Sequence, residues 1–451
     1  ESYKIITNIK FANFYKVFNN SFLYLGLRRM KSTARSSSRT KGLVEPTVWG
    51  EFSPLAVEHD AYNLGQGFPD WPCPDFCKNA VKNAVENNFN QYCRSAGHMP
   101  LVQTLAEQYS KSLNRKIDFS NEVTVSVGAT EGMFAIWQAF LNPGDEVVIF
   151  EPTFDVYKPQ IESSGGKCVF VPLRPNSEGK WVFDINELRN AFSDRTRAVL
   201  LNTPHNPTGK VFTVEEIKTI SDIMDEYSGI ILVTDEVYEK IVFEKDHTYP
   251  ASVEGMWEKT LMVSSAGKTF STTGWKIGWV IGPSELVLQV VNVNQWIQYC
   301  VPTLLQQAVA DSLKKALEPY KGHSSYYEYL RSTYQNKREK LVKGLEKANI
   351  ETYLPEGGIF VIGNIGEIRE FKGEVKDEYM KQSTPASKVM THDWAFCRWM
   401  TIEKKVTAIP CSAFYEAKNK HLASSMVRFA FCKSDDTIDG AIELLLKLGV
   451  K

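Results

Sequence analysis

Short apolar runs alternate with helix-like segments over much of the chain after residue 45. Each run has the length of a buried strand and is rich in strand-forming residues. We predict strands at 123–127, 146–150, 167–171, 198–202, 230–234 and 260–264. A helix is predicted between the first two of these strands, at 133–141. Continuous apolar strands separated by helices are typical of a mostly parallel sheet that helices cover on both faces.

The hydrophobic pattern changes after about residue 331. An amphipathic helix is predicted at 336–348, a turn and strand at 357–362, and further strands at 405–409 and 426–431. The charged interval 367–388 is interpreted as a surface insertion. These elements predict an α/β chain whose large domain is joined to a smaller α+β domain. The expected boundaries are 1–44 for a leader, 45–74 for the first part of the small domain, 75–330 for the large domain and 331–451 for the rest of the small domain.

The first 44 residues differ in composition from the rest of the chain. From Ser2 to Val44 there is no Asp or Glu, whereas Lys, Arg, Ser and Thr are frequent. A basic, hydroxyl-rich and acid-poor segment is typical of a mitochondrial targeting leader, which would direct the protein to the matrix. The apolar stretch 22–27 also suits a secretory signal. A third interpretation is an extension without a targeting role, which would leave the protein in the cytoplasm.

Composition argues against several classes of function. With 43% hydrophobic and 23% charged residues, the chain has the composition of a globular protein with a large core. Its net charge of −1 gives no electrostatic basis for binding nucleic acid or an anionic surface. No apolar run is long enough to predict a transmembrane helix. The spacing of the eight cysteines suggests neither a disulfide framework nor a zinc site, so no metal is expected.

Lys268 lies among small residues directly after the strand predicted at 260–264. A lysine in a tight, partly dry pocket has its charged form disfavoured, and its amine becomes available as a nucleophile. Small neighbours let a flat ring approach the backbone, an arrangement that suits pyridoxal phosphate (PLP) held as a Schiff base. The alternative is a solvated surface lysine. A phosphate-binding P-loop is excluded, because it needs a glycine five positions before Gly267 and that position is occupied by Met262.

Two polar segments follow other predicted strands and could serve the same ring. Asp235 follows the strand at 230–234, and a carboxylate there can keep a pyridine nitrogen protonated; Tyr238 could reach the phenolic oxygen of the ring. Asp235 could instead cap the next helix. Asn206 lies in a loop that Pro204 and Pro207 restrict, which suits a side chain that must point at one ring oxygen. A plain turn would explain the same prolines.

Three further positions have residue types that suit ligand binding. Gly128 and Ala129 end a strand and start a helix, where backbone N–H groups bind phosphate. Phe154 follows a strand and could stack on a ring, although core packing is the commoner role of Phe. Arg428 lies in an apolar strand and needs an anionic partner. That partner could be a substrate carboxylate or an internal Asp or Glu.

Together these segments resemble the fold type I PLP-dependent aminotransferases. The similarity is strongest to the group of kynurenine aminotransferase, glutamine transaminase K and cysteine conjugate β-lyase, and it extends from about Val48 to the C-terminus. The segments that carry it are 63–70, 90–92, 202–210, 235–238 and 265–279. The resemblance implies a seven-stranded, mostly parallel sheet between helices in the large domain. It also implies a homodimer with shared active sites.

The resemblance assigns roles to individual residues. Lys268, Asp235 and Tyr238 would be catalytic. The implied cofactor-binding residues are Gly128, Ala129, Phe154, Asn206, Asp235, Tyr238, Ser265, Lys268, Lys276 and, on the neighbouring subunit, Tyr92. The implied substrate-binding residues are Trp49, Gly67, Asn206, Tyr299, Phe360 and Arg428. Thr130 and Cys300 depart from the family pattern, in which tyrosine and histidine are common at these positions, and this puts the substrate preference in doubt.

The activity that the resemblance implies is transamination. Kynurenine, related aromatic amino acids, glutamine and sulfur amino acids are the expected donors, and a 2-oxo acid is the expected acceptor. One alternative is β-lyase activity at the same site, on a substrate with a leaving group on its β-carbon. A second is a protein that binds PLP without turnover, but such a protein has no need for Lys268, Asp235, Tyr238, Asn206 and Arg428 together.

Overall fold

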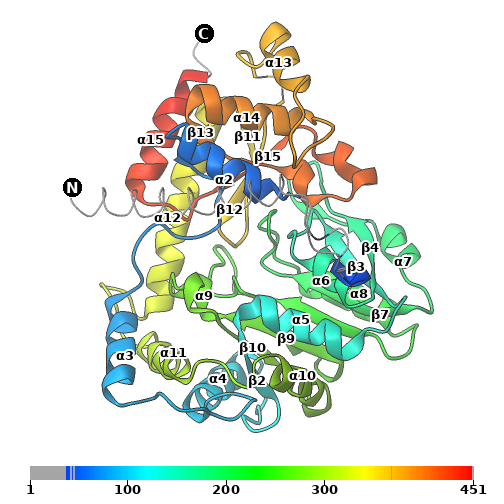
Figure 1. Ribbon diagram of the computed structural model, residues 1–451, viewed down its shortest axis with the longest axis vertical. Coiled ribbons are helices and arrows are strands. Elements are labelled where there is room, and N and C mark those ends of the chain that lie inside the picture. Colours follow the sequence, from blue (N-terminus) through cyan, green and yellow to red (C-terminus); the bar gives the residue numbers. More distant parts are fainter. Residues whose placement is uncertain (1–36, 41–42, 44–45, 367, 449–451) are drawn as a thin grey trace, which may run out of the picture.

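The computed structural model describes residues 37–40, 43, 46–366 and 368–448. The predicted leader at 1–44 therefore lies outside the described residues apart from 37–40 and 43. Two main sheets organise the chain. The larger, with its helices, fills the lower and right-hand part of Figure 1, and the smaller lies above it. Within the described ranges, no helix combines the length and apolar character needed to cross a membrane.

The larger sheet has seven strands and confirms the predicted α/β fold class. In spatial order they are β2 (Val123–Val127), β10 (Ile277–Ile281), β9 (Thr260–Ser265), β8 (Ile231–Asp235), β7 (Thr196–Asn202), β3 (Glu146–Glu151) and β4 (Lys167–Pro172). The five strands from β9 to β4 are parallel, whereas β10 runs antiparallel to both of its neighbours. The hydrophobic pattern did not identify β10, because Gly278 interrupts its apolar run.

Helices connect and cover these strands. They are α3 (Asp75–Glu86), α4 (Met99–Ser112), α5 (Gly128–Phe140), α6 (Tyr157–Ser163), α7 (Ile185–Asn190), α8 (Val214–Met224), α9 (Ala266–Thr269), α10 (Ser284–Ile297) and α11 (Thr303–Lys315). A two-stranded hairpin of β5 (Arg174–Pro175) and β6 (Trp181–Val182) lies between β4 and α7 in the chain.

Side-chain alternation explains why both faces of the larger sheet are covered. In β7, Ala198 and Leu200 belong to a hydrophobic core that α5 and α10 complete. Val199 and Leu201 of the same strand belong to the opposite core, which α8 completes. Successive side chains of a strand point to opposite faces, so an uninterrupted apolar run requires a layer of helices on each side.

The smaller sheet has four strands in the order β11 (Glu351–Tyr353), β12 (Phe360–Asn364), β15 (Met426–Ala430) and β14 (Ile409–Pro410). A separate parallel ladder joins β1 (Tyr62–Asn63) to β13 (Val406–Thr407), so the segment before residue 75 pairs with the C-terminal part of the chain. The helices of this part are α2 (Val48–Glu58), α12 (Tyr326–Lys347), α13 (Gly373–Met380), α14 (His392–Lys404) and α15 (Asp435–Leu445).

Three predicted elements differ from the structure in extent. α5 begins at Gly128 rather than at residue 133. α12 begins ten residues before its predicted start, because the Ser325 side chain accepts a hydrogen bond from the backbone N–H of Glu328 and caps the helix there. The strand predicted at 405–409 is divided, since β13 pairs with β1 whereas β14 pairs with β15.

The charged interval interpreted as a surface insertion contains packed structure. It includes α13, which packs on α14. Phe371 and Tyr379 are buried there, and the Phe371 ring lies 5.2 Å from the Trp399 ring of α14, centroid to centroid. The interpretation as surface is therefore wrong for these aromatic residues, whose signal was masked by the charges around them.

The carboxyl ends of β7, β8 and β9 meet at one edge of the larger sheet. Asn202 is the last residue of β7 and pairs in register with Asp235, the last residue of β8. β9 ends at Ser265, and α9 with Lys268 follows directly. The polar residues that follow the predicted strands therefore lie side by side, at the position where open parallel sheets bind their ligands.

Candidate active site

A cavity of about 700 Å³ opens at this edge, between the larger and the smaller sheet. It is lined by all the predicted cofactor residues except Tyr92, namely Gly128, Ala129, Phe154, Asn206, Asp235, Tyr238, Ser265, Lys268 and Lys276. Of the predicted substrate residues, Trp49, Gly67, Asn206, Phe360 and Arg428 line the same cavity. Tyr299 does not. The fold thus gathers residues from segments that lie far apart in the sequence.

Lys268 presents its amine to the cavity from α9, directly after β9. The Nζ atom donates a hydrogen bond to the backbone carbonyl of Gly67 and lies 5.7 Å from the centroid of the Tyr238 ring. Burial lowers the pKa of the Lys268 amine to about 8, because its charged form is poorly solvated there. About a tenth of this amine is therefore unprotonated at pH 7, far more than for a lysine with the usual pKa.

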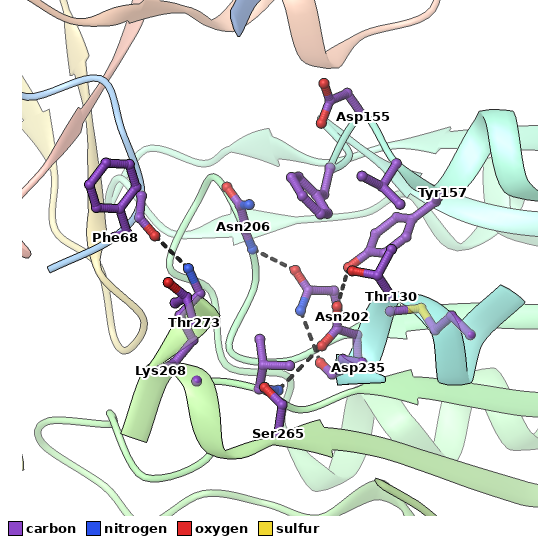
Figure 2. A pocket seen from close by; sticks show the side chains of 18 of the residues that line it. Phe68, Thr130, Asp155, Tyr157, Asn202, Asn206, Asp235, Ser265, Lys268 and Thr273 are labelled. Carbon is purple, nitrogen blue, oxygen red and sulfur yellow. Dashed lines mark hydrogen bonds between the residues drawn. The ribbon is translucent and has the colours of Figure 1, made fainter. Parts of the chain in front are cut away.

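Asp235 is a buried carboxylate held by two donors. The Tyr157 hydroxyl donates to Oδ2 at 2.6 Å, and the Val237 backbone N–H donates to Oδ1 at 3.2 Å (Figure 2). Burial raises the pKa of Asp235 to about 6, and the hydrogen bond from Tyr157 opposes that increase. Asp235 is therefore mostly ionised at neutral pH and can accept a hydrogen bond from a protonated group of a ligand.

Asn206 and Arg428 form the end of the cavity nearest the smaller sheet. The Arg428 side chain, which is 1% exposed, donates from Nη1 to Asn206 Oδ1 at 3.0 Å and from Nη2 to the Gly65 carbonyl at 2.7 Å. The Asn206 backbone N–H donates in turn to Asn202 Oδ1 at 2.6 Å. Within the described residues Arg428 has no carboxylate partner in hydrogen-bond contact, and its Nε lacks any acceptor. Burial lowers the pKa of Arg428 to about 10, so the group stays cationic.

The start of α5 forms a cationic corner of the same cavity. Backbone N–H groups in the first turn of a helix have no partner within the helix, and Gly128 and Ala129 of that turn line the cavity. Gly128 has a positive φ of 71°, and a Cβ atom there would lie 3.0 Å from Lys276 Nζ. The absence of a side chain at Gly128 leaves room for the ammonium group, and the corner is suited to an anion such as phosphate.

The remaining wall is aromatic and close-packed. A Cβ atom on Gly67 would lie 2.5 Å from the Phe360 ring, so glycine is required where this loop passes the ring. The Trp49 indole donates from Nε1 to Asp155 Oδ2 at 2.7 Å. The guanidinium carbon of Arg428 lies 3.9 Å from the Phe360 ring centroid and 5.1 Å from that of Trp49. A ligand whose carboxylate binds Arg428 would therefore place the rest of its structure against these aromatic rings.

Tyr92 and Tyr299 lie outside this cavity, on the surface of the same chain. Their rings meet edge to face with centroids 5.2 Å apart, and 81% of Tyr92 and 54% of Tyr299 is exposed. α10 ends at Ile297, and the left-handed backbone of Tyr299, with φ of 65°, then turns its side chain toward Tyr92. Of the two positions that depart from the family pattern, Thr130 lines the cavity, whereas Cys300 follows Tyr299 outside it.

Tyr157 and Asn202 position other residues of the site, although the sequence predicted no role for either of them. Tyr157, the first residue of α6, holds Asp235, and Asn202 holds both the Asp235 carbonyl, at 2.9 Å, and the Asn206 backbone. Asn202 could have been found from its position at a strand end. Tyr157 gave no comparable signal, because its contact depends on how α6 packs against β8.

This arrangement suits one kind of ligand. An unprotonated amine at Lys268 can attack a carbonyl carbon. Asp235 can hold a cationic ring nitrogen, the start of α5 with Lys276 can hold a phosphate, and Arg428 can hold a second anion. The donor set therefore fits an aldehyde-bearing pyridine phosphate together with a carboxylate-bearing substrate.

Comparisons with known proteins agree with this description of the site. The family model for aminotransferase class I and II matches residues 59–445, and the chain belongs to that family, whose members use PLP. It is an aminotransferase with the type I fold, as predicted.

Several similar proteins within this family are kynurenine–oxoglutarate transaminases. A kynurenine–oxoglutarate transaminase of Dictyostelium discoideum is 39% identical over 436 residues, which cover 93% of this chain and 98% of the relative. Kynurenine–oxoglutarate transaminase 1 of Homo sapiens is 38% identical over 90% of this chain and 97% of its own length. The crystal structure of Bna3p, a candidate kynurenine aminotransferase from Saccharomyces cerevisiae, superimposes with a TM-score of 0.85 at 32% identity, covering 93% of this chain and 99% of that one.

Proposed function

We propose that this chain binds PLP and transfers the amino group of kynurenine, and of related aromatic, glutamine or sulfur amino acids, to a 2-oxo acid. The observation that carries the proposal is one cavity that holds the Lys268 amine, the Asp235 carboxylate and the Arg428 guanidinium together. Similarity over at least nine-tenths of the chain to kynurenine–oxoglutarate transaminases supports the choice of donor.

Different residues of the cavity would bind different parts of PLP. Asp235 would bind the ring nitrogen, and Asn206 and Tyr238 would bind the phenolic oxygen of the ring. The first turn of α5, with Ser265 and Lys276, would bind the phosphate. Phe154 would pack on the ring. When bound, the cofactor supplies an electron-withdrawing ring that stabilises negative charge on the substrate α-carbon.

The side chains of the protein would then bind the substrate and move protons. Arg428 and Asn206 would grip the α-carboxylate, since a guanidinium can give two parallel hydrogen bonds to it. The aromatic wall of Trp49 and Phe360 would receive the side chain of the amino acid. Lys268 would take the α-proton as a neutral amine and return it to a different atom, a positioned transfer that contributes roughly 10²–10⁴-fold to the rate. Its pKa of about 8 suits a group that must gain and lose a proton near neutral pH.

Two further statements belong to this proposal. The exposed pair Tyr92 and Tyr299 would serve the cavity of a second copy in a homodimer, because large exposed aromatic groups commonly mark an interaction surface. The basic and acid-poor segment 1–44 would direct the protein to the mitochondrial matrix.

The test is a pair of half-reactions followed by absorbance. Purified protein loaded with PLP is mixed with kynurenine alone, and the cofactor band should be lost as the amino group is transferred. Kynurenic acid should form in proportion to the amino groups transferred from kynurenine. Addition of 2-oxoglutarate should then restore the band. A band that ignores kynurenine but responds to glutamine or methionine would overturn the choice of donor. Pyruvate and ammonia from a substrate with a β-leaving group, without transamination, would favour the lyase.

A further inference from the structure

Cys93 and Cys300 are brought together beside the aromatic pair Tyr92 and Tyr299. Each cysteine directly follows one of the two tyrosines, whose ring centroids are 5.2 Å apart. The buried amide of Gln306 also joins the two segments. Its Nε2 donates to Cys93 Sγ at 3.3 Å and to the backbone carbonyl of Val301, next to Cys300, at 2.7 Å.

The surroundings of the Cys300 thiol agree with this proximity. Burial above all raises the pKa of Cys300, the backbone N–H of Cys93 lowers it and the Cys93 thiol raises it. Both cysteines are only partly buried, unlike Cys77 or Cys397. Within one chain, this pair is therefore more accessible to a small oxidant than the thiols of the core.

We propose that Cys93 and Cys300 form a reversible disulfide when the protein meets hydrogen peroxide. In the first step one thiolate attacks a peroxide oxygen and becomes a sulfenic acid, while the other oxygen leaves as water after protonation. In the second step the other thiol attacks the sulfenic sulfur, the S–S bond forms and a second water leaves. The two thiols lose two electrons in total, the peroxide gains them, and a dithiol reductant reverses the change.

The surroundings assign the two steps to different cysteines. Gln306 Nε2 donates to the Cys93 sulfur and is placed to stabilise the negative charge on that sulfur during attack on peroxide. Gln306 is held in place because its Oε1 accepts the His98 backbone N–H at 2.7 Å. Cys93 is therefore the thiol that attacks peroxide. The raised pKa of Cys300 makes it the poorer first nucleophile, and Cys300 resolves the sulfenic acid.

The consequence for activity rests on the proposed function of the aromatic pair. A bond between Cys93 and Cys300 would tie the two segments together immediately beside Tyr92 and Tyr299. Tyr299 already has a left-handed backbone that only a few non-glycine residues adopt. Because the pair would have to fit the cavity of a second copy, we expect the disulfide to lower transaminase activity severalfold.

Mass spectrometry tests the bond independently of activity. PLP-loaded protein is treated with hydrogen peroxide, blocked with N-ethylmaleimide and digested with trypsin, which should yield a linked pair of peptides, 83–94 and 277–314. We expect this pair in the wild type and in the matched control Cys73→Ser, and its loss in Cys93→Ser, in Cys300→Ser and after dithiothreitol. Peptides that carry only blocked thiols after peroxide treatment would overturn the proposal.

Two further measurements separate the parts of the proposal. Gln306→Met should slow formation of the linked peptide, whereas an unchanged rate would contradict the assignment of Cys93 as the attacking thiol. Activity is measured for each variant relative to its own untreated sample. Loss that dithiothreitol restores, in the wild type and Cys73→Ser only, supports the link to activity. A linked peptide with unchanged activity would overturn that link, and failure of untreated protein to transaminate would concern the proposed function instead.

Discussion

The wall of the cavity around Asp235 and the surface around Tyr92 differ in how completely one chain builds them. Asp235 is 5% exposed, and its carboxylate accepts hydrogen bonds from Tyr157 and Val237. Tyr92 is 81% exposed and packs its ring edge to face against Tyr299. The first region is already arranged for a ligand. The second presents exposed aromatic groups outside the cavity that holds Asp235.

This difference indicates a division of labour. Groups that must hold a cofactor in a fixed electrostatic environment are most effective when they are preorganised, because no reorganisation is then needed during the reaction. Groups that close a site from outside can be supplied by another copy of the same chain. We therefore expect changes at the inner wall to affect the chemistry, and changes at the aromatic pair to affect how two copies complete each other.

Substitution Lys268→Ala should have the largest effect. It removes both the attachment point for the cofactor and the proton carrier, so steady-state transamination should fall by at least roughly 10²–10⁴-fold. The circular dichroism spectrum should be unchanged, since the amine faces the cavity and does not form part of a hydrophobic core. Substantial activity in a folded variant would contradict the assignment of the inner wall as the site of chemistry.

Tyr92→Ala tests the outer region through complementation between subunits. By itself the variant should lose most of its activity. When Tyr92→Ala and Lys268→Ala subunits are mixed and reassembled in equal amounts, half of the dimers are mixed, and each has one intact site. Activity should then return to about a quarter of the wild-type value. A mixture as inactive as its components would show that Tyr92 does not act across subunits. Val389→Ala, at another side chain that is 82% exposed, provides the control.

Tyr157→Phe should have a smaller effect on the inner wall. The substitution keeps the ring and removes one hydrogen bond to a carboxylate, an interaction worth roughly 1.5–3 kcal/mol, so kcat should fall by about tenfold. Because this hydrogen bond lowers the pKa of Asp235, its loss should raise that pKa further. The acidic limb of the pH–rate profile should therefore move to higher pH. A tenfold loss with an unmoved limb would indicate a packing role only.

The pH dependence of cofactor loading should show the smallest effect, which is a shift in midpoint. Burial lowers the pKa of Lys268 to about 8, so the reactive neutral amine should become the major form above that pH instead of above the usual value of 10.5. Cofactor-free protein is incubated with PLP over a pH series, reduced with borohydride, and analysed for labelling of Lys268 by mass spectrometry. A midpoint near that of an exposed lysine would contradict the environment described for this amine.

Local sequence patterns predicted much of the larger sheet, and the resemblance supplied Lys268, Asp235, Arg428 and several other residues that line the cavity. Apolar runs of strand length are a strong signal, and the polar residues that follow them mark the edge where ligands bind. The contact of Tyr157 with Asp235 and that of Gln306 with Cys93 were not predicted, because each depends on the packing of segments distant in sequence. The exposed position of Tyr299 follows from a backbone conformation that its neighbours in the sequence do not indicate. The domain boundaries and the individual catalytic roles stay predictions.

Arg428 has a consequence for how the molecule responds to heat. It belongs to β15 of the smaller sheet, yet it donates to Asn206 from the loop after β7 of the larger sheet and to the Gly65 carbonyl. A carboxylate bound there would add its binding free energy to a contact that crosses between the two halves of the protein. By linkage, the halves should then melt at a higher temperature and more nearly as one cooperative unit than they do in the absence of substrate.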